Sequence, residues 1–309
     1  MSKPGILVLT AAGKTGLPIA LQLLGEAFLV TAFVRQEDRR SERLKSKGAD
    51  IVVGSLTDPG DMRRAMAGAQ RAYFNAPTPM KEGTLKIASV FTAIAAEHKL
   101  ESVVAMSQWL ANPRHPSVHT RKVWLGDRLL ALLPGTDVTA INVGFFVDND
   151  MQSMVFTAQF GTLMLPYGAG RNAPPSNEDI AVVIAEILAR PDGHTGQTYR
   201  PTGPKRLSPQ DMAAIFSKIF GRKIRYVDAP LPIMAKVMQG MGFSDFVTAQ
   251  TIEYYRDYQR NAFAVGAPTE VVRKITGRDP EDFETIARRY ATTMPDVKRS
   301  LGTQLRLMG

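Results

Sequence analysis

The sequence contains no cysteine among its 309 residues, which excludes disulfides, thiolate nucleophiles and cysteine-ligated metals. It has only four histidines, and the closest pair, His115 and His119, has no carboxylate motif around it, so we expect no metal site. Long hydrophobic runs are also missing, since no segment reaches about 18 uninterrupted apolar residues. We therefore expect neither a signal peptide nor contact with a membrane, and the cytoplasm is the expected compartment.

Charge of one sign is not concentrated in any part of the chain. The net charge is +9, and residues 1–150 and 151–309 carry a similar basic excess. A surface that follows a nucleic-acid backbone needs basic residues gathered in a patch or stripe, so we expect no nucleic-acid partner. A diffuse positive charge instead favours anionic small molecules.

Short apolar runs alternate with amphipathic segments through the first half. The runs predict six strands, at residues 6–9, 29–34, 51–53, 72–74, 103–107 and 138–143. Between them, apolar residues at helical spacing predict helices, at residues 17–24, 62–67, 85–98 and 123–133. This order predicts an α/β fold with a doubly wound parallel sheet of the Rossmann type, whose ligand binds beyond the carboxyl ends of the strands.

The pattern changes after residue 150 and becomes mostly helical. Residues 151–160 and 179–189 predict two helices, Ser208-Pro209 begins a third that ends at Gly221, and Asp279-Pro280 begins a fourth. We predict a Rossmann domain at 1–150 and a smaller, substrate-side domain at 151–309, of which residues 178–200 can pack back on the first.

The segment from Ile6 to Gly16, ILVLTAAGKTG, joins the first strand to the first helix through small residues. Gly13 and Gly16 occupy the second and third glycine positions of the dinucleotide fingerprint, where they allow a close approach of pyrophosphate and close helix packing. The first glycine position holds Thr10, and a nucleoside triphosphate loop is excluded because Val8 replaces its first glycine. An ordinary glycine turn is the alternative. The predicted cofactor-binding residues of this turn are Thr10, Ala11, Ala12, Gly13, Lys14, Thr15 and Gly16.

Arg35 follows the second strand, where an enzyme selecting NAD normally places a carboxylate for the ribose 2′-hydroxyl. A guanidinium there can bind a 2′-phosphate through two hydrogen bonds, so we predict NADP(H) as cofactor, with NAD less favoured. A solvated basic turn is the alternative, because Glu37 and Asp38 partly neutralise Arg39 and Arg40.

The chain resembles the NmrA-like proteins, atypical members of the short-chain dehydrogenase/reductase superfamily, over nearly its whole length. The motifs are loose individually, but their order and spacing carry the resemblance. They are the turn at 10–16, Val34-Arg35, GSLTDPGDMRRAMAGAQRAYF at 54–74, VVAMSQ at 103–108, VTAINVGFFVDN at 138–149, NEDIA at 177–181 and LSPQDMAAIFSKIFGRKIRYVDAP at 207–230.

The resemblance implies further cofactor contacts. Ser55 and Leu56 match residues on the adenine side, and Asn75, Ala76 and Pro77 match residues along the ribose and nicotinamide. Lys122 matches a lysine that contacts the nicotinamide ribose. Residues from Phe146 to Asn149 would close over the nicotinamide end.

The catalytic pattern of the superfamily is incomplete. The tyrosine expected four residues before Lys122 is replaced by Val118, and His119 is a poor geometric substitute. Ser107 matches the superfamily's serine and could bond a substrate oxygen, although a serine that caps a strand end is an equal alternative. The predicted catalytic residues are therefore Lys122 and Ser107.

Two function classes fit these features. The first is a reductase that passes hydride from NADPH to a small electron-poor acceptor such as a quinone, an azo or triarylmethane dye, an enone or a carbonyl. The second is a non-catalytic redox sensor in which NADP(H) binding alters contact with a partner protein. The sequence leaves the substrate and the oligomeric state open, a homodimer included.

Overall fold

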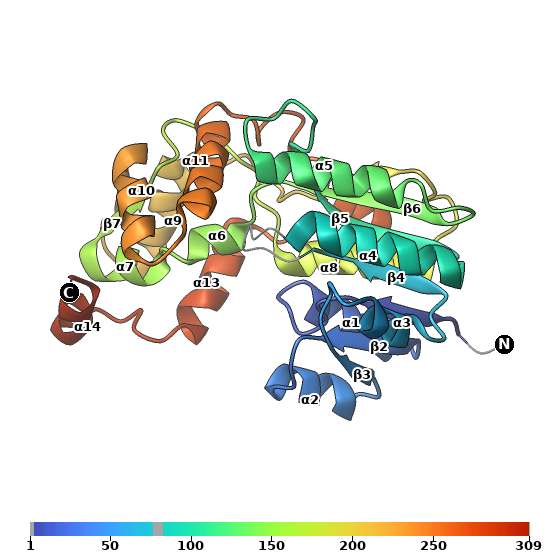
Figure 1. Ribbon diagram of the computed structural model, residues 1–309. Helices are drawn as coiled ribbons and strands as arrows, with labels where there is room; N and C mark the ends of the chain where they lie inside the picture. Colours follow the sequence, from blue (N-terminus) through green and yellow to red (C-terminus); the bar gives the residue numbers. More distant parts are fainter. Residues whose placement is uncertain (1–2, 77–82, 309) are drawn as a thin grey trace. The chain divides into compact units, whose positions relative to one another are not determined.

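The computed structural model describes residues 3–76 and 83–308 (Figure 1). The described chain divides into two compact units. The first unit comprises Met1–Val143, Asn177–Pro201 and Val271–Arg278, and the second comprises Gly144–Ser176, Thr202–Glu270 and Asp279–Gly309.

A seven-stranded parallel sheet forms the centre of the first unit. Its strands are β1 (Gly5–Val8), β2 (Leu29–Val34), β3 (Asp50–Val53), β4 (Arg71–Phe74), β5 (Ser102–Gln108), β6 (Asp137–Val143) and β8 (Thr198–Tyr199). Their spatial order is β3-β2-β1-β4-β5-β6-β8, so the winding reverses between β1 and β4. This is the predicted doubly wound Rossmann sheet, and all six predicted strands are confirmed.

Helices cover both faces of this sheet. They are α1 (Gly16–Gly25), α2 (Arg39–Ser46), α3 (Pro59–Met66), α4 (Gly83–His98), α5 (Val118–Leu130), α8 (Asn177–Ala189) and α12 (Val271–Thr276). Contacts join α3 to α4 and α4 to α5 in one layer, and α1 to α8 and α8 to α12 in the other. Figure 1 shows α4 and α5 side by side along the strands. Side chains from β1, β4 and β5 pack under α3 and α4 in one apolar core that includes Leu7, Phe74 and Phe91.

The second unit combines short helices with a small parallel ribbon. Its elements are α6 (Val147–Met151), α7 (Met154–Phe160), β7 (Thr162–Leu165), α9 (Pro209–Phe220), β9 (Arg225–Asp228), α10 (Leu231–Gly240), α11 (Asp245–Gln259), α13 (Phe283–Thr293) and α14 (Leu301–Met308). Strands β7 and β9 pair in parallel. Its core is aromatic, with Tyr167 stacked on Tyr258 at 3.8 Å between ring centroids and Phe145 edge-on to both.

Helix boundaries in the second half test the capping predictions. Ser208 and Gly221 bound α9 as predicted, and Gly221 has the left-handed φ of +62° that favours glycine. The helix predicted at 151–160 is confirmed from Met154 to Phe160 as α7, but it does not start at Met151, which is the last residue of the separate helix α6. The predicted start at Asp279 is also wrong, since the side chain of Asp282 caps α13 and Phe283 is its first residue.

Candidate functional site

The turn between β1 and α1 folds tightly around the carbonyl of Thr10. The amide of Gly13 donates to this carbonyl at 2.7 Å. A Cβ atom on Gly16 would lie 2.3 Å from the same oxygen, so only glycine fits there. Thr10 itself has a φ of +52°, the left-handed conformation that the absent first glycine would favour, at a cost of about 1–2 kcal/mol. The backbone thus keeps the glycine-turn geometry without the first glycine.

The N-terminus of α1 is open to an anion. Thr15, at the N-cap, donates its hydroxyl to Asn177 at 2.8 Å and makes no side-chain cap to the helix. Within the described first turn, which begins at Gly16, there is no acidic residue. By contrast, α2 and α3 are capped by Asp38 and Asp58. Since helix amides and the helix dipole attract negative charge, this end of α1 suits a phosphate.

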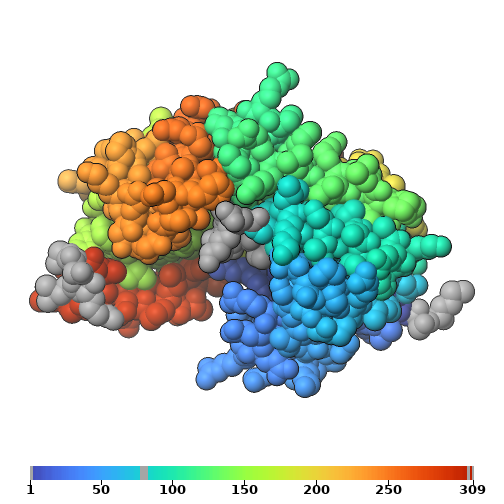
Figure 2. All heavy atoms as spheres, in the orientation of Figure 1, coloured from blue at the N-terminus to red at the C-terminus, as the bar shows by residue number. Residues whose placement is uncertain are grey.

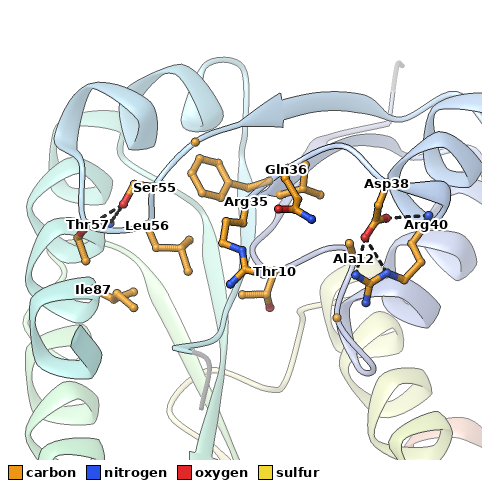
Figure 3. Close-up of a pocket in the computed structure, with 14 residues that line it drawn as sticks. Thr10, Ala12, Arg35, Gln36, Asp38, Arg40, Ser55, Leu56, Thr57 and Ile87 are labelled. Carbon is orange, nitrogen blue, oxygen red and sulfur yellow. Dashed lines mark hydrogen bonds and ion pairs between the residues drawn. The ribbon is translucent and has the colours of Figure 1, made fainter. Parts of the chain in front are cut away.

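A cavity of about 520 Å³ lies at the carboxyl ends of β1, β2 and β3 (Figure 3). Six residues predicted from the sequence line it: Thr10, Ala12, Gly13, Arg35, Ser55 and Leu56. Lining residues that the sequence did not single out as contacts include Gln36, Asp38, Arg40, Thr57 and Ile87. The sheet therefore brings the glycine turn and the residues after β2 and β3 into one site.

Two of the arginines after β2 differ in their pairing. Arg40 donates from Nε to Asp38 at 3.0 Å and forms an ion pair with it. This bond holds the pKa of the Asp38 carboxyl down at about 2 and raises the pKa of Arg40. Arg35 is exposed and makes no ion pair within the described part of the chain, and Figure 3 shows its guanidinium between Leu56 and Thr10. Arg35 is thus available to an anionic ligand.

The residues after β3 form the apolar end of the cavity. Ser55 donates its amide to Asp61 at 2.7 Å, and its hydroxyl lies 3.0 Å from that of Thr57. Leu56 is half-buried against the core of the unit, and Ile87 lines the same cavity. Because the polar atoms of Ser55 are engaged locally, Leu56 and Ile87 offer an apolar surface suited to a flat ring.

The other predicted cofactor residues have different positions. Asn75 donates to the hydroxyl of Thr10 at 3.3 Å, which joins the end of β4 to the glycine turn. Ala76 is half-buried, whereas Pro77 lies outside the described residues. Ala11 and Thr15 are buried and Lys14 is exposed, and these three side chains are not among those that line the cavity.

The predicted catalytic serine is engaged with a partner that the sequence did not reveal. Ser107, 1% exposed near the end of β5, donates to Oδ2 of Asp127 on α5 at 2.6 Å. Burial raises the pKa of Asp127 to about 6, against the lowering effects of Ser107 and Arg128. Twenty positions separate the two residues, so no local motif links them.

Helix α5 carries the remaining catalytic candidates. Val118 is its first residue, and Lys122 is half-buried in the second turn. His119 is buried, and burial together with the nearby Lys122 lowers its pKa to about 4. The imidazole is therefore neutral at neutral pH and is a weak acid for protonating a substrate.

Phe146 and Asn149 belong to the second unit. Phe146 precedes α6 as its N-cap residue, and its carbonyl accepts the Asn149 amide at 3.1 Å. Their role near a nicotinamide stays a prediction. Among the described residues, no group of His, Asp and Glu side chains could hold a metal ion, and no helix is long and apolar enough to span a bilayer.

Comparison with known proteins places these features in a family. The profile of the NmrA-like family matches residues 2–262. A curated NAD(P)H azoreductase of Xenophilus azovorans is 27% identical over 93% of this chain and 98% of its own length.

Solved structures share the fold at lower identity. NADPH-dependent quinone oxidoreductase from Escherichia coli, complexed with NADPH, superposes with a TM-score of 0.80 at 16% identity, covering 92% of this chain and 99% of its own. NmrA, a negative transcriptional regulator in complex with NADP, gives a TM-score of 0.75 at 18% identity, covering 96% and 99%.

Proposed function

This chain belongs to the NmrA-like family, and on that basis we propose that it is an NADPH-dependent reductase. Its acceptor is a small electron-poor molecule that takes up hydride: a quinone, an azo or triarylmethane dye, an enone or a carbonyl compound. When bound, the dinucleotide supplies the hydride, and the protein supplies binding, orientation and exclusion of water.

The cavity at the ends of β1, β2 and β3 carries this proposal. The amides around Gly13 and the open N-terminus of α1 suit a pyrophosphate, and the exposed guanidinium of Arg35 suits a 2′-phosphate. Leu56 and Ile87 suit the adenine ring. The three sets of residues follow the order of the pyrophosphate, the 2′-phosphate and the adenine ring in the cofactor. The residues present therefore fit NADPH.

Two further residues are assigned to the nicotinamide end of the cofactor, where hydride is transferred. Lys122 holds the nicotinamide ribose through hydrogen bonds, because the usual tyrosine partner is replaced by Val118 and leaves no phenol whose acidity a lysine could raise. Ser107 lies near the carboxyl end of β5, the edge of the sheet where ligands of doubly wound folds bind. Phe146 and Asn149 are assigned to the nicotinamide end of the cofactor. Residues 151–309, apart from those that belong to the first unit, are assigned to the substrate side.

The named relatives support reduction of an electron-poor acceptor. One is an azoreductase by name, and a protein of the same fold is a quinone oxidoreductase. Acceptors of this kind take up hydride without a dedicated phenol, so Val118 does not conflict with the reaction.

The test is a panel assay with the purified protein. NADPH and each acceptor class are added, and the loss of reduced-cofactor absorbance is followed. Sustained, enzyme-dependent turnover with at least one acceptor is expected. Binding of NADPH without turnover of any acceptor would refute the reductase.

A redox sensor is the second candidate function, and Val118 is the observation that favours it. A regulator needs no proton donor, and the NmrA structure is that of a negative transcriptional regulator bound to NADP. Tight NADP(H) binding combined with no turnover across the panel is the outcome that this alternative predicts.

A further inference from the structure

Ser107, which is buried, and Asp127, which is half-buried, form a polar pair at the carboxyl end of β5, where the reaction is proposed. Ser107 is the next-to-last residue of β5, and α5, which carries Asp127, packs against this strand. The 2.6 Å separation between Oγ and Oδ2 is typical of a hydroxyl that donates to a carboxylate. The Ser107 proton is donated to Asp127 while that carboxyl is ionised. When Asp127 is protonated, its carboxyl can donate to Oγ instead, which leaves the Ser107 proton free for another acceptor.

The surroundings of this pair bring the pKa of Asp127 close to neutral pH. Burial raises the pKa of Asp127 to about 6, while the Ser107 hydrogen bond and the charge of Arg128 oppose that rise. Strand β5 brings no ionisable side chain against α5, and Glu97 on α4 is bonded to Arg63. The other ionisable side chains on α4 and α5 are Lys86, His98, His119, Arg121 and Lys122.

A second polar atom lies beside Ser107 on the sheet. Asn142 of β6 is the register partner of Ser107, so both side chains point to the same face. Its buried Oδ1 accepts no hydrogen bond from any described residue. Ser107 is thus flanked by a carboxyl group that donates or accepts a proton and by an amide oxygen with unused capacity.

Hydride reduction of an azo, enone or carbonyl group also requires one proton, and the chain lacks the usual phenol at Val118. We infer that Asp127 and Ser107 form a relay that delivers this proton, an inference that rests on the proposed reductase function. As hydride adds to one nitrogen of an azo group, or to a carbon of a carbonyl or enone, the Ser107 hydroxyl proton passes to the other azo nitrogen or to the carbonyl oxygen. The carboxyl proton of Asp127 moves to Oγ of Ser107, and the carboxylate is reprotonated from solvent. The acceptor gains one hydride and one proton.

The relay predicts a dependence on acceptor chemistry. A cationic triarylmethane dye takes hydride at its central carbon and becomes neutral without any proton. An azo dye cannot be reduced to a hydrazine without one. The relay therefore speeds reduction of the azo dye and leaves the rate of triarylmethane reduction unchanged, although both reactions use the same cofactor site.

The first test needs no cofactor. In protein labelled with ¹³C at aspartate carboxyls, the Asp127 resonance, assigned by its loss in Asp127→Asn, is expected to titrate near pH 6. Ser107→Ala is expected to move that titration to higher pH, because it removes a hydrogen bond to the carboxylate. A resonance that titrates with an ordinary aspartate pKa, or that ignores Ser107→Ala, overturns the relay.

The second test compares the two acceptors in Asp127→Asn, with Asp137→Asn at the exposed start of β6 as the matched control. General acid catalysis raises a rate by about 100-fold or more. The azo rate divided by the triarylmethane rate is therefore expected to fall by about that factor in Asp127→Asn and to stay unchanged in Asp137→Asn. The wild-type azo rate is expected to decline above about pH 6, and this limb is expected to disappear in the variant.

Equal losses on both acceptors, or no loss on either, overturn the relay while leaving the reductase intact. A wild-type protein that reduces no acceptor of the whole panel overturns the proposed function and the relay with it. NADPH affinity, measured in every variant, separates a defect in proton delivery from a defect in cofactor binding.

Discussion

At the scale of single residues, we expect cofactor preference to depend on how the charges after β2 are paired. Arg40 is bonded to Asp38, whereas Arg35 lines the cavity without an ion pair among the described residues. A charge-assisted pair with a 2′-phosphate contributes roughly 1–3 kcal/mol, so NADPH should bind about 5- to 150-fold more tightly than NADH.

Arg35→Ala should erase most of this difference and leave NADH affinity nearly unchanged, because NADH has no 2′-phosphate. Titration of both cofactors, followed by the fluorescence of the reduced nicotinamide, measures it. Arg39→Ala is the control, since Arg39 is exposed on α2 and is not among the cavity-lining residues. Equal affinities of the two cofactors in the wild-type protein would contradict the assignment.

We expect Asp38 to limit NADPH binding, because it holds the guanidinium of Arg40. Asp38→Asn should keep the cap of α2, because asparagine is as good an N-cap residue as aspartate. It should release Arg40 and remove a negative charge from the cavity, so NADPH affinity should rise with an unchanged melting temperature. No gain for NADPH relative to NADH would show that Arg40 does not reach the 2′-phosphate.

Lys122 is expected to position the cofactor. Lys122→Met should weaken NADPH binding and leave the rate at saturating cofactor largely intact. A lysine that transfers protons would instead lower kcat and change the shape of the pH profile. The exposed neighbour Arg121 provides the control, and a Lys122→Met variant that behaves like Arg121→Met would indicate an ordinary surface lysine.

At the scale of elements, the β1–α1 turn should separate binding from folding. A Cβ on Gly13 would lie 3.0 Å from the Thr10 carbonyl, which small shifts can relieve, whereas at Gly16 the distance is 2.3 Å. Gly13→Val should therefore abolish binding of NADPH and NADH while retaining a cooperative unfolding transition. Gly16→Val should lower the melting temperature as well. Normal NADPH affinity in a folded Gly13→Val protein would mean that the fingerprint is misplaced.

The elements that the sequence predicts are those with a continuous apolar signal. All six strands of the predicted sheet have one, and so do α1, α4 and α8. Helix α2 was missed because only Ser41 and Leu44 are buried in it, and Figure 2 shows this blue segment at the surface of the first unit. The two-residue strand β8 is too short to give any periodic signal.

The candidate site is predictable where its residues are close in sequence. The turn from Thr10 to Gly16 and the arginine after β2 belong to one βαβ unit, so spacing alone places them together. Asp127 could not be predicted, because only the packing of α5 on β5 brings it to Ser107. The Asp38–Arg40 bond depends on where α2 begins, and the sequence did not indicate that boundary.

At the scale of the whole molecule, stability should depend on pH through the second unit. Asp150 is fully buried and accepts the hydroxyl of Tyr167 at 2.9 Å, and burial raises its pKa to about 8, with Asp148 adding to the effect. Because the folded state holds this proton more tightly than the unfolded state, stability is greatest at acidic pH and declines as pH rises to about 8.

Asp150→Asn should remove that dependence, since an amide does not ionise and its oxygen can still accept from Tyr167. Thermal unfolding at pH 5 and pH 8 should show the variant gaining stability over the wild type only at the higher pH. Tyr167→Phe serves as the companion variant that removes the hydrogen bond alone. Parallel pH profiles for the wild type and Asp150→Asn would contradict a buried, protonated carboxyl.

A single-turnover experiment tests the central claim most directly. Excess protein is mixed with a limiting amount of NADPH, an azo or quinone acceptor is then added, and nicotinamide fluorescence reports binding and oxidation in one trace. If the protein is a reductase, nicotinamide fluorescence should increase on binding. After the acceptor is added, it should be lost completely at a rate that depends on acceptor concentration. A bound signal that persists for every acceptor, or no binding signal at all, would contradict it.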